Sequence, residues 1–314
     1  MPIKRKKRPS LTEIIIVLLV ALSSYIGYEE YGGEFKDIFL APQQENDWKT
    51  DIIEAKIYFC PVDDCETALI EHINESTDVS CAFFDPELDT LARVLEEKKA
   101  RVVIDDGYED ELDNFKINYI TDESSKLMHN KFCILDNSTI ITGSMNPTEY
   151  GTKRNDNNLV VIDSDLLAQN YMDEFNEMFI QKKFHSKTSE KVRYPKIKSH
   201  DNKTYIENYF CPEDMCEYNV LRILDRANQS IRFMTFSFTS DPIGKLLLEK
   251  AKTIEVVGVF ETRQNKGSQW SEYQKFKDRD DMDVILDNNP GSMHHKVFIV
   301  DDSIVITGSY NPSK

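Results

Sequence analysis

The sequence predicts an α/β protein made of two related α/β halves arranged around a pseudo-two-fold axis, preceded by an apolar N-terminal helix. Three observations predict this fold class. Short apolar runs alternate with segments of helical spacing from residue 51 onward. A pair of cysteines occurs at two equivalent places, Cys60/Cys65 and Cys211/Cys216. A longer polar motif also occurs twice, which indicates that one structural unit has been duplicated.

The N-terminal segment, residues 1–28, combines a basic flank with an apolar stretch. Lys4–Arg8 are five consecutive cations, and residues 14–28 carry no charge. Residues 11–28 reach the low end of the roughly 17 to 25 residues that span a bilayer. We interpret residues 1–28 as a membrane anchor, with a signal peptide cleaved near Ala21-Leu22-Ser23 or a buried helix as alternatives.

Charge in this segment also predicts the location of the protein. Positive flanks stay in the cytoplasm, so we expect a membrane-anchored protein whose globular part is extracytoplasmic, with a secreted protein as the alternative. The segment 29–50 contains Glu29, Glu30, Glu34, Pro42, Gln43 and Gln44 and has weak periodicity. We interpret it as a linker that holds the domain off the membrane.

The predicted halves span residues 51–190 and 191–314. In the first half we expect strands at 55–59, 79–84, 101–105, 117–120, 132–135, 139–142 and 159–162, and helices at 65–73, 89–99 and 165–179. In the second half we expect helices at 220–227 and 243–251 and strands at 231–238 and 254–260. The offset between halves grows from 151 residues at Cys60 and Cys211 to 165 at the polar motif, so the segment 261–277 holds about fourteen extra residues.

The C-terminal end differs between the halves. The chain ends three residues after Asn311, whereas the first half continues for about forty residues past the equivalent Asn146. We therefore expect a truncated second half, whose unpaired sheet edge would favour aggregation or dimerisation.

The duplicated motif reads His-x-Lys, four residues, Asp, six residues, Gly-Ser-x-Asn. Its first copy runs from His129 to Asn146 and its second from His294 to Asn311. Six fixed positions at fixed spacing arise by chance in far fewer than about one chain in ten thousand. Two copies in one chain make coincidence negligible.

The motif suits chemistry at a phosphate. The alternation of a strand places His129 and Lys131 on the same side. Lysine is a point charge suited to a phosphate oxygen, and histidine is a nucleophile or proton carrier near neutral pH. Displacement at phosphorus needs a nucleophile and an acid, so two copies facing each other would make one site.

At these residues the chain resembles the phospholipase D superfamily of phosphodiesterases, over roughly residues 52–314. The resemblance implies a phosphohistidine intermediate, no cofactor and no metal. It implies catalytic roles for His129 and His294 in an order left open, phosphate binding by Lys131 and Lys296, and support from Ser144, Asn146, Ser309 and Asn311. Asp136 and Asp301 complete the motif, but their odd offset from the lysines predicts a structural role.

The substrate stays open at this stage. We predict a nuclease-like, metal-independent phosphodiester hydrolase, because the chain is compact with few insertions. A phospholipase D or a phosphatidyltransferase is the alternative, which the predicted membrane anchor favours. A noncatalytic binding protein is the third alternative. The formal net charge of −17 becomes −22 without the five N-terminal cations, so the surface as a whole does not attract nucleic acid or anionic lipid. The oligomeric state cannot be predicted.

One residue departs from the family pattern. Where the family usually carries a glutamate that contacts an active-site histidine, this chain has Asn157, within the run Asn155-Asp156-Asn157-Asn158. The absence of this glutamate leaves open which group orients that histidine and sets its pKa. Asp156 is the candidate substitute.

The cysteines predict two local disulfides, Cys60–Cys65 and Cys211–Cys216, if the domain is exported. A four-cysteine zinc site and unpaired thiols are the alternatives. Cys81 and Cys133 fall in apolar strands, and we expect plain core residues there. The segment 261–277 mixes cations with Trp270 and Tyr273, which predicts either a substrate rim or an ordinary loop with one buried tryptophan.

Overall fold

The computed structural model describes residues 47–123, 126–185 and 190–314, and Trp48–Lys314 form one compact unit. The predicted anchor, residues 1–28, and most of the predicted linker lie outside the described residues. Within those residues, we find no helix with the length and apolar character needed to cross a bilayer.

The first half is built on a seven-stranded mixed sheet in the order β2-β8-β7-β6-β3-β4-β5. Its strands are β2 (Glu54–Cys60), β3 (Val79–Phe83), β4 (Arg101–Ile104), β5 (Asn118–Thr121), β6 (Lys131–Leu135), β7 (Thr139–Gly143) and β8 (Asn157–Asp163). Strands β3, β4 and β5 are parallel, while β6, β7, β8 and β2 pair antiparallel. Both motif strands, β6 and β7, therefore lie at the centre of the sheet.

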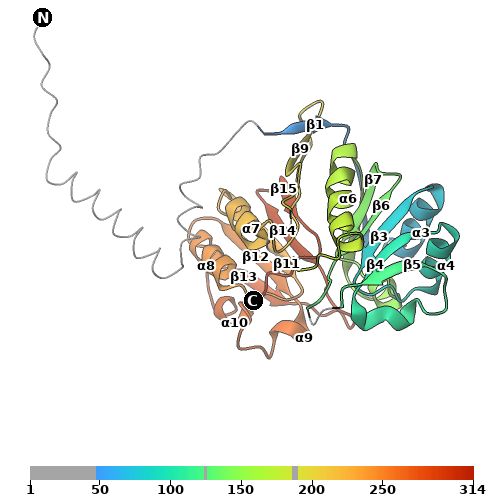
Figure 1. Ribbon diagram of the computed structural model, residues 1–314. Coiled ribbons are helices and arrows are strands. Elements are labelled where there is room, and N and C mark those ends of the chain that lie inside the picture. The colour runs from blue at the N-terminus through green and yellow to red at the C-terminus, as the bar shows by residue number, and fades with distance from the viewer. Residues whose placement is uncertain (1–46, 124–125, 186–189) are drawn as a thin grey trace, which may run out of the picture. The chain divides into compact units, whose positions relative to one another are not determined.

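Helices cover both faces of this sheet (Figure 1). They are α3 (Cys65–Glu75), α4 (Asp89–Glu97), α5 (Glu149–Lys153) and α6 (Asp165–Phe179), with a 3-10 turn, η1, at Asp106–Glu111. Along β6, Cys133 and Leu135 pack into the core beneath α3 and α4, and Phe132 and Ile134 pack into the core beneath α6. The alternation of a strand explains this division, because successive side chains point to opposite faces.

Helix starts follow local capping chemistry. Asp64 accepts a hydrogen bond from the Thr67 backbone N–H at the start of α3, and Ser164 accepts one from Leu167 at the start of α6. Such side chains satisfy backbone donors that have no partner within the helix, which fixes the first residue of the helix.

The second half repeats the pattern on a five-stranded sheet in the order β13-β12-β11-β14-β15. Its strands are β11 (Ser230–Thr235), β12 (Glu255–Phe260), β13 (Asp283–Leu286), β14 (Lys296–Val300) and β15 (Ile304–Ile306), and its helices are α7 (Cys216–Leu224), α8 (Asp241–Lys250), α9 (Thr262–Asn265) and α10 (Tyr273–Phe276). The order β13-β12-β11-β14-β15 is the same as the order β5-β4-β3-β6-β7 in the first half. The predicted α/β fold of two related halves is therefore confirmed. The connection from β12 to β13 has 22 residues where that from β4 to β5 has 13, so it holds nine extra residues instead of the fourteen that we expected, and it contains α9 and α10.

A third, three-stranded sheet lies outside this repeat. It has the order β1-β9-β10, with β1 (Lys49–Asp51), β9 (Lys196–Ser199) and β10 (Tyr205–Glu207). Figure 1 shows β1 beside β9, the strand that connects the two halves. Lys49 and Thr50, which we assigned to the linker, thus belong to the compact unit, because they pair with a strand about 150 residues away that sequence periodicity cannot identify.

All six cysteines are paired in the structure. Disulfides join Cys60 to Cys65 and Cys211 to Cys216, as in the first of our three alternatives. A third disulfide joins Cys81 to Cys133, so our expectation of plain core residues at these positions is wrong. Both side chains are buried as expected, but they face each other directly across β3 and β6, with Cα atoms 4.1 Å apart. Only the strand register reveals this proximity.

Candidate active site

Backbone hydrogen bonds bring the second motif to the first half. Asp156 N–H donates to the Ser292 carbonyl at 2.9 Å, and His294 N–H donates to the Asp156 carbonyl at 2.9 Å. This bridge joins the segment before β8 to the residues before β14. The bridge places His294 next to the residues that follow β7.

The ring of His294 is held by acceptors from the first half. Its Nδ1 lies 3.1 Å from the Ser144 carbonyl oxygen and 2.9 Å from Oδ1 of Asn157. The Asn157 amide is oriented by its own Nδ2, which donates to the Gly151 carbonyl at 2.8 Å. Both neighbours of Nδ1 are therefore acceptors, so Nδ1 carries the proton and Nε2 keeps its lone pair.

The contact between Asn157 and His294 also shows the role of the residue that differs from the family pattern. Asn157 occupies the place that the family gives to glutamate, and it contacts an active-site histidine through a neutral amide oxygen. Asp156, our candidate substitute, contributes its backbone to the bridge, and its charge acts on His295. The orienting contact is retained here without a carboxylate.

His129 occupies the matching place in the first half. The backbone of Ser309 acts to raise the pKa of His129, against the lowering by burial, as the backbone of Ser144 does for His294. Phe84 packs against His129 with ring centroids 5.0 Å apart, and Phe236 packs against His294 at 4.6 Å. The two motifs are therefore related in three dimensions as well as in sequence.

The lysines are buried beside the histidines. Lys131 and Lys296 are 4% and 3% exposed, and each Nζ donates to the carbonyl of the histidine two residues earlier, at 3.1 and 2.7 Å. Their Nζ atoms lie 5.0 Å from the Phe84 ring and 4.9 Å from the Phe236 ring. Burial lowers the pKa of Lys131 to about 7 and that of Lys296 well below its usual value.

The histidines respond to the same surroundings. Burial, followed by the charges of Lys131 and Lys296, lowers the pKa of His129 to about 2. The pKa of His294 is lowered well below its usual value, again first by burial and then by both lysines. Mutual repulsion among four desolvated basic groups is relieved by a bound anion, so the site favours an anionic ligand.

The two Gly-Ser-x-Asn segments complete the site. Gly143 and Gly308 have φ values of 142° and 145°, and a Cβ on Gly143 would lie 2.3 Å from the Asn158 carbonyl oxygen. Buried Oδ1 atoms of Asn146 and Asn311 have no hydrogen-bond partner in the part of the chain that the structure describes. Each amide is therefore free to turn a donor or an acceptor toward a ligand.

The motif aspartates lie apart from this chemistry. Oδ1 of Asp136 accepts hydrogen bonds from the backbone N–H groups of Thr77 and Asp78, at 2.9 and 2.8 Å. Asp301 accepts from the backbone N–H groups of residues 228–230 in the same way. Both carboxylates support the turn before a neighbouring strand, β3 or β11, which is a structural role.

Sequence reasoning missed some contributors to the site. Besides the two phenylalanines, it missed Asn158, whose Nδ2 lies 3.1 Å from Nδ1 of His295 and whose Oδ1 accepts from Thr307 Oγ1 at 3.1 Å. A signal existed for the phenylalanines, because Phe84 and Phe236 are 152 residues apart, close to the offset of the cysteines. Asn158 had no comparable signal.

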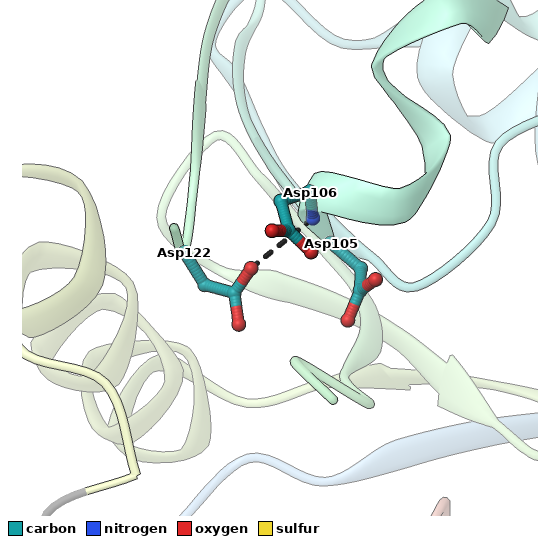
Figure 2. A group of neighbouring side chains, drawn as sticks. All are labelled: Asp105, Asp106 and Asp122. Atoms are coloured by element: carbon teal, nitrogen blue, oxygen red, sulfur yellow. Dashed lines mark hydrogen bonds between the residues drawn. The ribbon is translucent and has the colours of Figure 1, made fainter. Parts of the chain in front are cut away.

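Three carboxylates lie close together near the start of the first motif, and the sequence analysis did not predict this cluster. Figure 2 shows Asp105, Asp106 and Asp122, which each place one oxygen within 4.8 Å of the others. Asp105 accepts from the Met128 backbone N–H at 2.8 Å, and Asp122 accepts from Asp106 N–H at 3.1 Å and lies 3.0 Å from Nε2 of His185. Asp105 thus positions Met128, the residue before His129, and Asp122 supports the backbone at Asp106.

The second half contains the same support. Asp287 follows β13 as Asp122 follows β5, and it accepts from the Thr262 backbone N–H at 2.7 Å. Because Thr262 replaces Asp106 in this repeat, the hydrogen bond persists where the acidic cluster does not.

The segment 261–277 contains no buried tryptophan, contrary to our second alternative. Trp270 is 63% exposed, and Lys314 Nζ lies 5.5 Å from its ring. Arg263 donates to the Pro290 carbonyl, and Lys275 pairs with Asp241 and Glu272. These cations are used within the fold, which weakens the case for a substrate rim.

The comparisons with known proteins agree with this geometry. The family model described as "Cardiolipin synthase, PLD-like domain" matches residues 69–179 and 220–314, well over half of the chain. The chain belongs to this phospholipase D-like family of phosphodiesterases.

Particular relatives match over shorter stretches. The chain is 34% identical over 58 residues to the mitochondrial cardiolipin hydrolase of Xenopus tropicalis, which is 18% of this chain and 28% of that protein. It is 29% identical over 121 residues to a phospholipase D of Rickettsia felis, 37% of this chain and 60% of that protein. The chain thus covers less than two thirds of both relatives. The solved structure of phosphatidylserine synthase from Haemophilus influenzae Rd KW20 has the same fold, with a TM-score of 0.56 at 13% identity over 86% of this chain and 81% of that one.

Proposed function

We propose that this chain cleaves phosphodiesters without a metal, through a phosphohistidine intermediate. The observation that carries the proposal is the arrangement of His294, which is held by Ser144 and Asn157 of the other half and lies beside two buried lysines. One site built from both motifs supplies a nucleophile, a proton carrier and positive charge.

His294 is the proposed nucleophile, because two acceptors hold its proton on Nδ1. Its Nε2 lone pair forms a bond to phosphorus while the bond from phosphorus to the leaving oxygen breaks. Burial and then the lysine charges lower the pKa of His129, and the bound anion opposes this shift, so that His129 carries a proton and gives it to that oxygen. Water then attacks phosphorus and passes a proton to His129, and the N–P bond breaks with its electron pair returning to His294.

The lysines and the asparagine amides stabilise the charge that gathers on the phosphoryl oxygens. An alcohol that enters in place of water would give transfer instead of hydrolysis. Hydrolase and phosphatidyltransferase activities thus share one intermediate, and they differ in the acceptor that reaches it.

A phospholipid is the substrate that we favour. The relatives are named a phospholipase D and a cardiolipin hydrolase. The net charge of −17 disfavours nonspecific binding of nucleic acid and of anionic lipid alike, and it is compatible with a zwitterionic phospholipid.

A nuclease is the second candidate, and it was our first interpretation of the sequence. One observation favours it. Phe84 packs against His129 and, on a ring-centroid distance of 4.8 Å, against Tyr108, and both aromatic residues are partly exposed. Aromatic rings next to a phosphate site can stack on bases.

We further propose that the compact unit lies outside the cytoplasm, tethered by residues 1–28 or secreted after their removal. Three disulfides support this, because such bonds persist mainly in oxidising compartments. Thiol labelling of the unfolded, unreduced protein from its native source should find no free cysteine, and six free thiols would contradict the proposal.

The function is tested by parallel assays in EDTA. Purified full-length chain is incubated with vesicles of phosphatidylcholine or cardiolipin and with single-stranded DNA, and His294→Asn serves as the control for contaminating enzymes. Release of a lipid headgroup that depends on His294 is the expected result, and added ethanol should yield a transfer product. DNA cleavage alone would favour the nuclease. No activity on any substrate would favour a noncatalytic binding protein.

A further inference from the structure

A basic segment lies between the two halves of this acidic chain. Residues 190–203 hold five cations and two carboxylates, whereas the whole chain has a net charge of −17. The cations are Lys191, Arg193, Lys196, Lys198 and Lys203. None of these cations belongs to the candidate active site, so substrate binding at that site does not explain why they are concentrated here.

The third sheet arranges part of this segment on one face. β9 lies between β1 and β10, and its Ile197 and Ser199 are buried, while Lys196 and Lys198 are partly exposed on the opposite side. Tyr205 of β10 stands directly across from Lys198. Trp48 precedes β1 and lies level with Lys196, because Lys49 is in register with Ile197.

On this face two aromatic rings contact each other, and one lysine lies near them. The rings of Trp48 and Tyr205 meet edge to face with centroids 5.1 Å apart, and Lys196 Nζ lies 5.9 Å from the Trp48 ring. Tyr205 is 53% exposed. Glu207 of β10 stands across from Lys196 but pairs with Arg222, and among the described residues no carboxylate forms an ion pair with Lys196 or Lys198. We call Trp48, Lys196, Lys198 and Tyr205 the basic-aromatic face.

We propose that the basic-aromatic face binds the surface of a membrane that contains anionic phospholipids. Lysines without carboxylate partners are attracted to such a surface, at roughly a five-fold gain in affinity for each cation. Tryptophan and tyrosine are the side chains enriched at the boundary between headgroups and hydrocarbon.

Two observations favour a membrane over a nucleic acid. The two rings pack edge to face, so they do not form the parallel platform on which bases stack. Trp48 also follows Tyr28, the last residue of the uncharged apolar stretch, by only 20 residues. The proposal does not depend on which phosphodiester the active site cleaves.

The two tryptophans make the test direct. The chain contains only Trp48 and Trp270, so Trp270→Phe leaves a reporter on the basic-aromatic face, and Trp48→Phe leaves one elsewhere. Each full-length variant is reconstituted with vesicles of brominated phosphatidylcholine, with or without phosphatidylglycerol, and fluorescence quenching is measured. We expect strong quenching of Trp48 in anionic vesicles, weaker quenching in neutral vesicles or at high salt, and little quenching of Trp270.

Charge reversal provides the matched controls. Lys196→Glu with Lys198→Glu, in the Trp270→Phe chain, should reduce Trp48 quenching in anionic vesicles to the level in neutral vesicles. Lys116→Glu with Lys266→Glu changes the net charge equally at two exposed sites outside the sheet and should leave quenching intact. Near-ultraviolet circular dichroism checks folding. Equal quenching of both tryptophans, no effect of reversal at Lys196 and Lys198, or a Trp48 signal that responds to an oligonucleotide instead of lipid would overturn the proposal.

Discussion

The cores of the two halves differ at one pair of equivalent positions on neighbouring strands. In the first half, Cys81 of β3 faces Cys133 of β6, and a disulfide joins them. In the second half, the matching residues are Phe233 of β11 and Phe298 of β14, whose ring centroids lie 5.9 Å apart. A covalent bond in one core thus corresponds to an aromatic contact in the other.

The residue in register on the next strand differs between the halves in a way that matches this change. Val102 is in register with Cys81, whereas Gly258 is in register with Phe233. A Cβ on Gly258 would lie 2.0 Å from the Phe233 ring, so the large ring requires glycine beside it. The small cysteine leaves room for valine. The halves have diverged in their cores by compensating changes in volume.

The residues around the proposed chemistry have not diverged in this way. Each half supplies a histidine, a lysine two residues later, a phenylalanine against the histidine and an aspartate under the turn. The site therefore requires matched contributions from both halves, while the cores require only that volume be filled.

The largest effect is expected at the histidines. His129→Asn and His294→Asn should each lower kcat/KM by at least about a thousand-fold, because each role has one residue. The double variant should be little worse than either single variant, since the pair acts as a unit. Steady-state kinetics on the substrate identified above measures this. Independent, additive losses would show that the halves do not share a site.

The next effect concerns the second core. Gly258→Val copies the first half and should destabilise the protein by about 3 kcal/mol or more, through collision with Phe233. Adding Phe233→Ala should recover part of that loss, although Phe233→Ala alone also destabilises. Urea denaturation of the four proteins in this cycle gives the coupling. If the two changes simply add, the compensation that we describe does not exist.

The third disulfide should matter more than a local one. Cys81–Cys133 joins residues 52 positions apart, and Cys60–Cys65 joins residues 5 positions apart. In the chain-entropy model, removing the longer link by double alanine substitution costs about 2 kcal/mol more than removing the shorter one. Thermal or urea unfolding compares the two variants. Equal losses would mean that packing, and not loop closure, controls the stability of the first half.

The smallest effect is expected at the motif aspartates. Backbone hydrogen bonds lower the pKa values of Asp136 and Asp301 from their usual 3.8, so each stabilises the fold above that pH and loses its effect as acid protonates it. Asp136→Asn and Asp301→Asn should lower Tm by a few degrees at pH 7, with kcat unchanged and Tm values that converge with wild type in acid. A large loss of kcat would give these residues a catalytic role instead.

Much of the fold and site could be predicted from the sequence because the signals are local or repeated. The helix over 165–179 and the two motifs depend on residues close together in the chain. The rest depends on strand pairing between distant residues. The disulfide between Cys81 and Cys133, the pairing of β1 with β9 and the contact of Asn157 with His294 all join segments whose register the sequence does not specify.

The most direct test of one shared site is the trapping of the phosphohistidine. In EDTA, His129→Asn is mixed with bis(4-nitrophenyl) phosphate, whose leaving group needs no acid, and the reaction is stopped in alkali for mass spectrometry. We predict a burst of one nitrophenolate per chain and a phosphoryl adduct on His294 that hydrolyses slowly, because His129 is missing as the base. His294→Asn should show neither burst nor adduct. A burst that EDTA abolishes reversibly, or an adduct that persists in His294→Asn, would contradict the account.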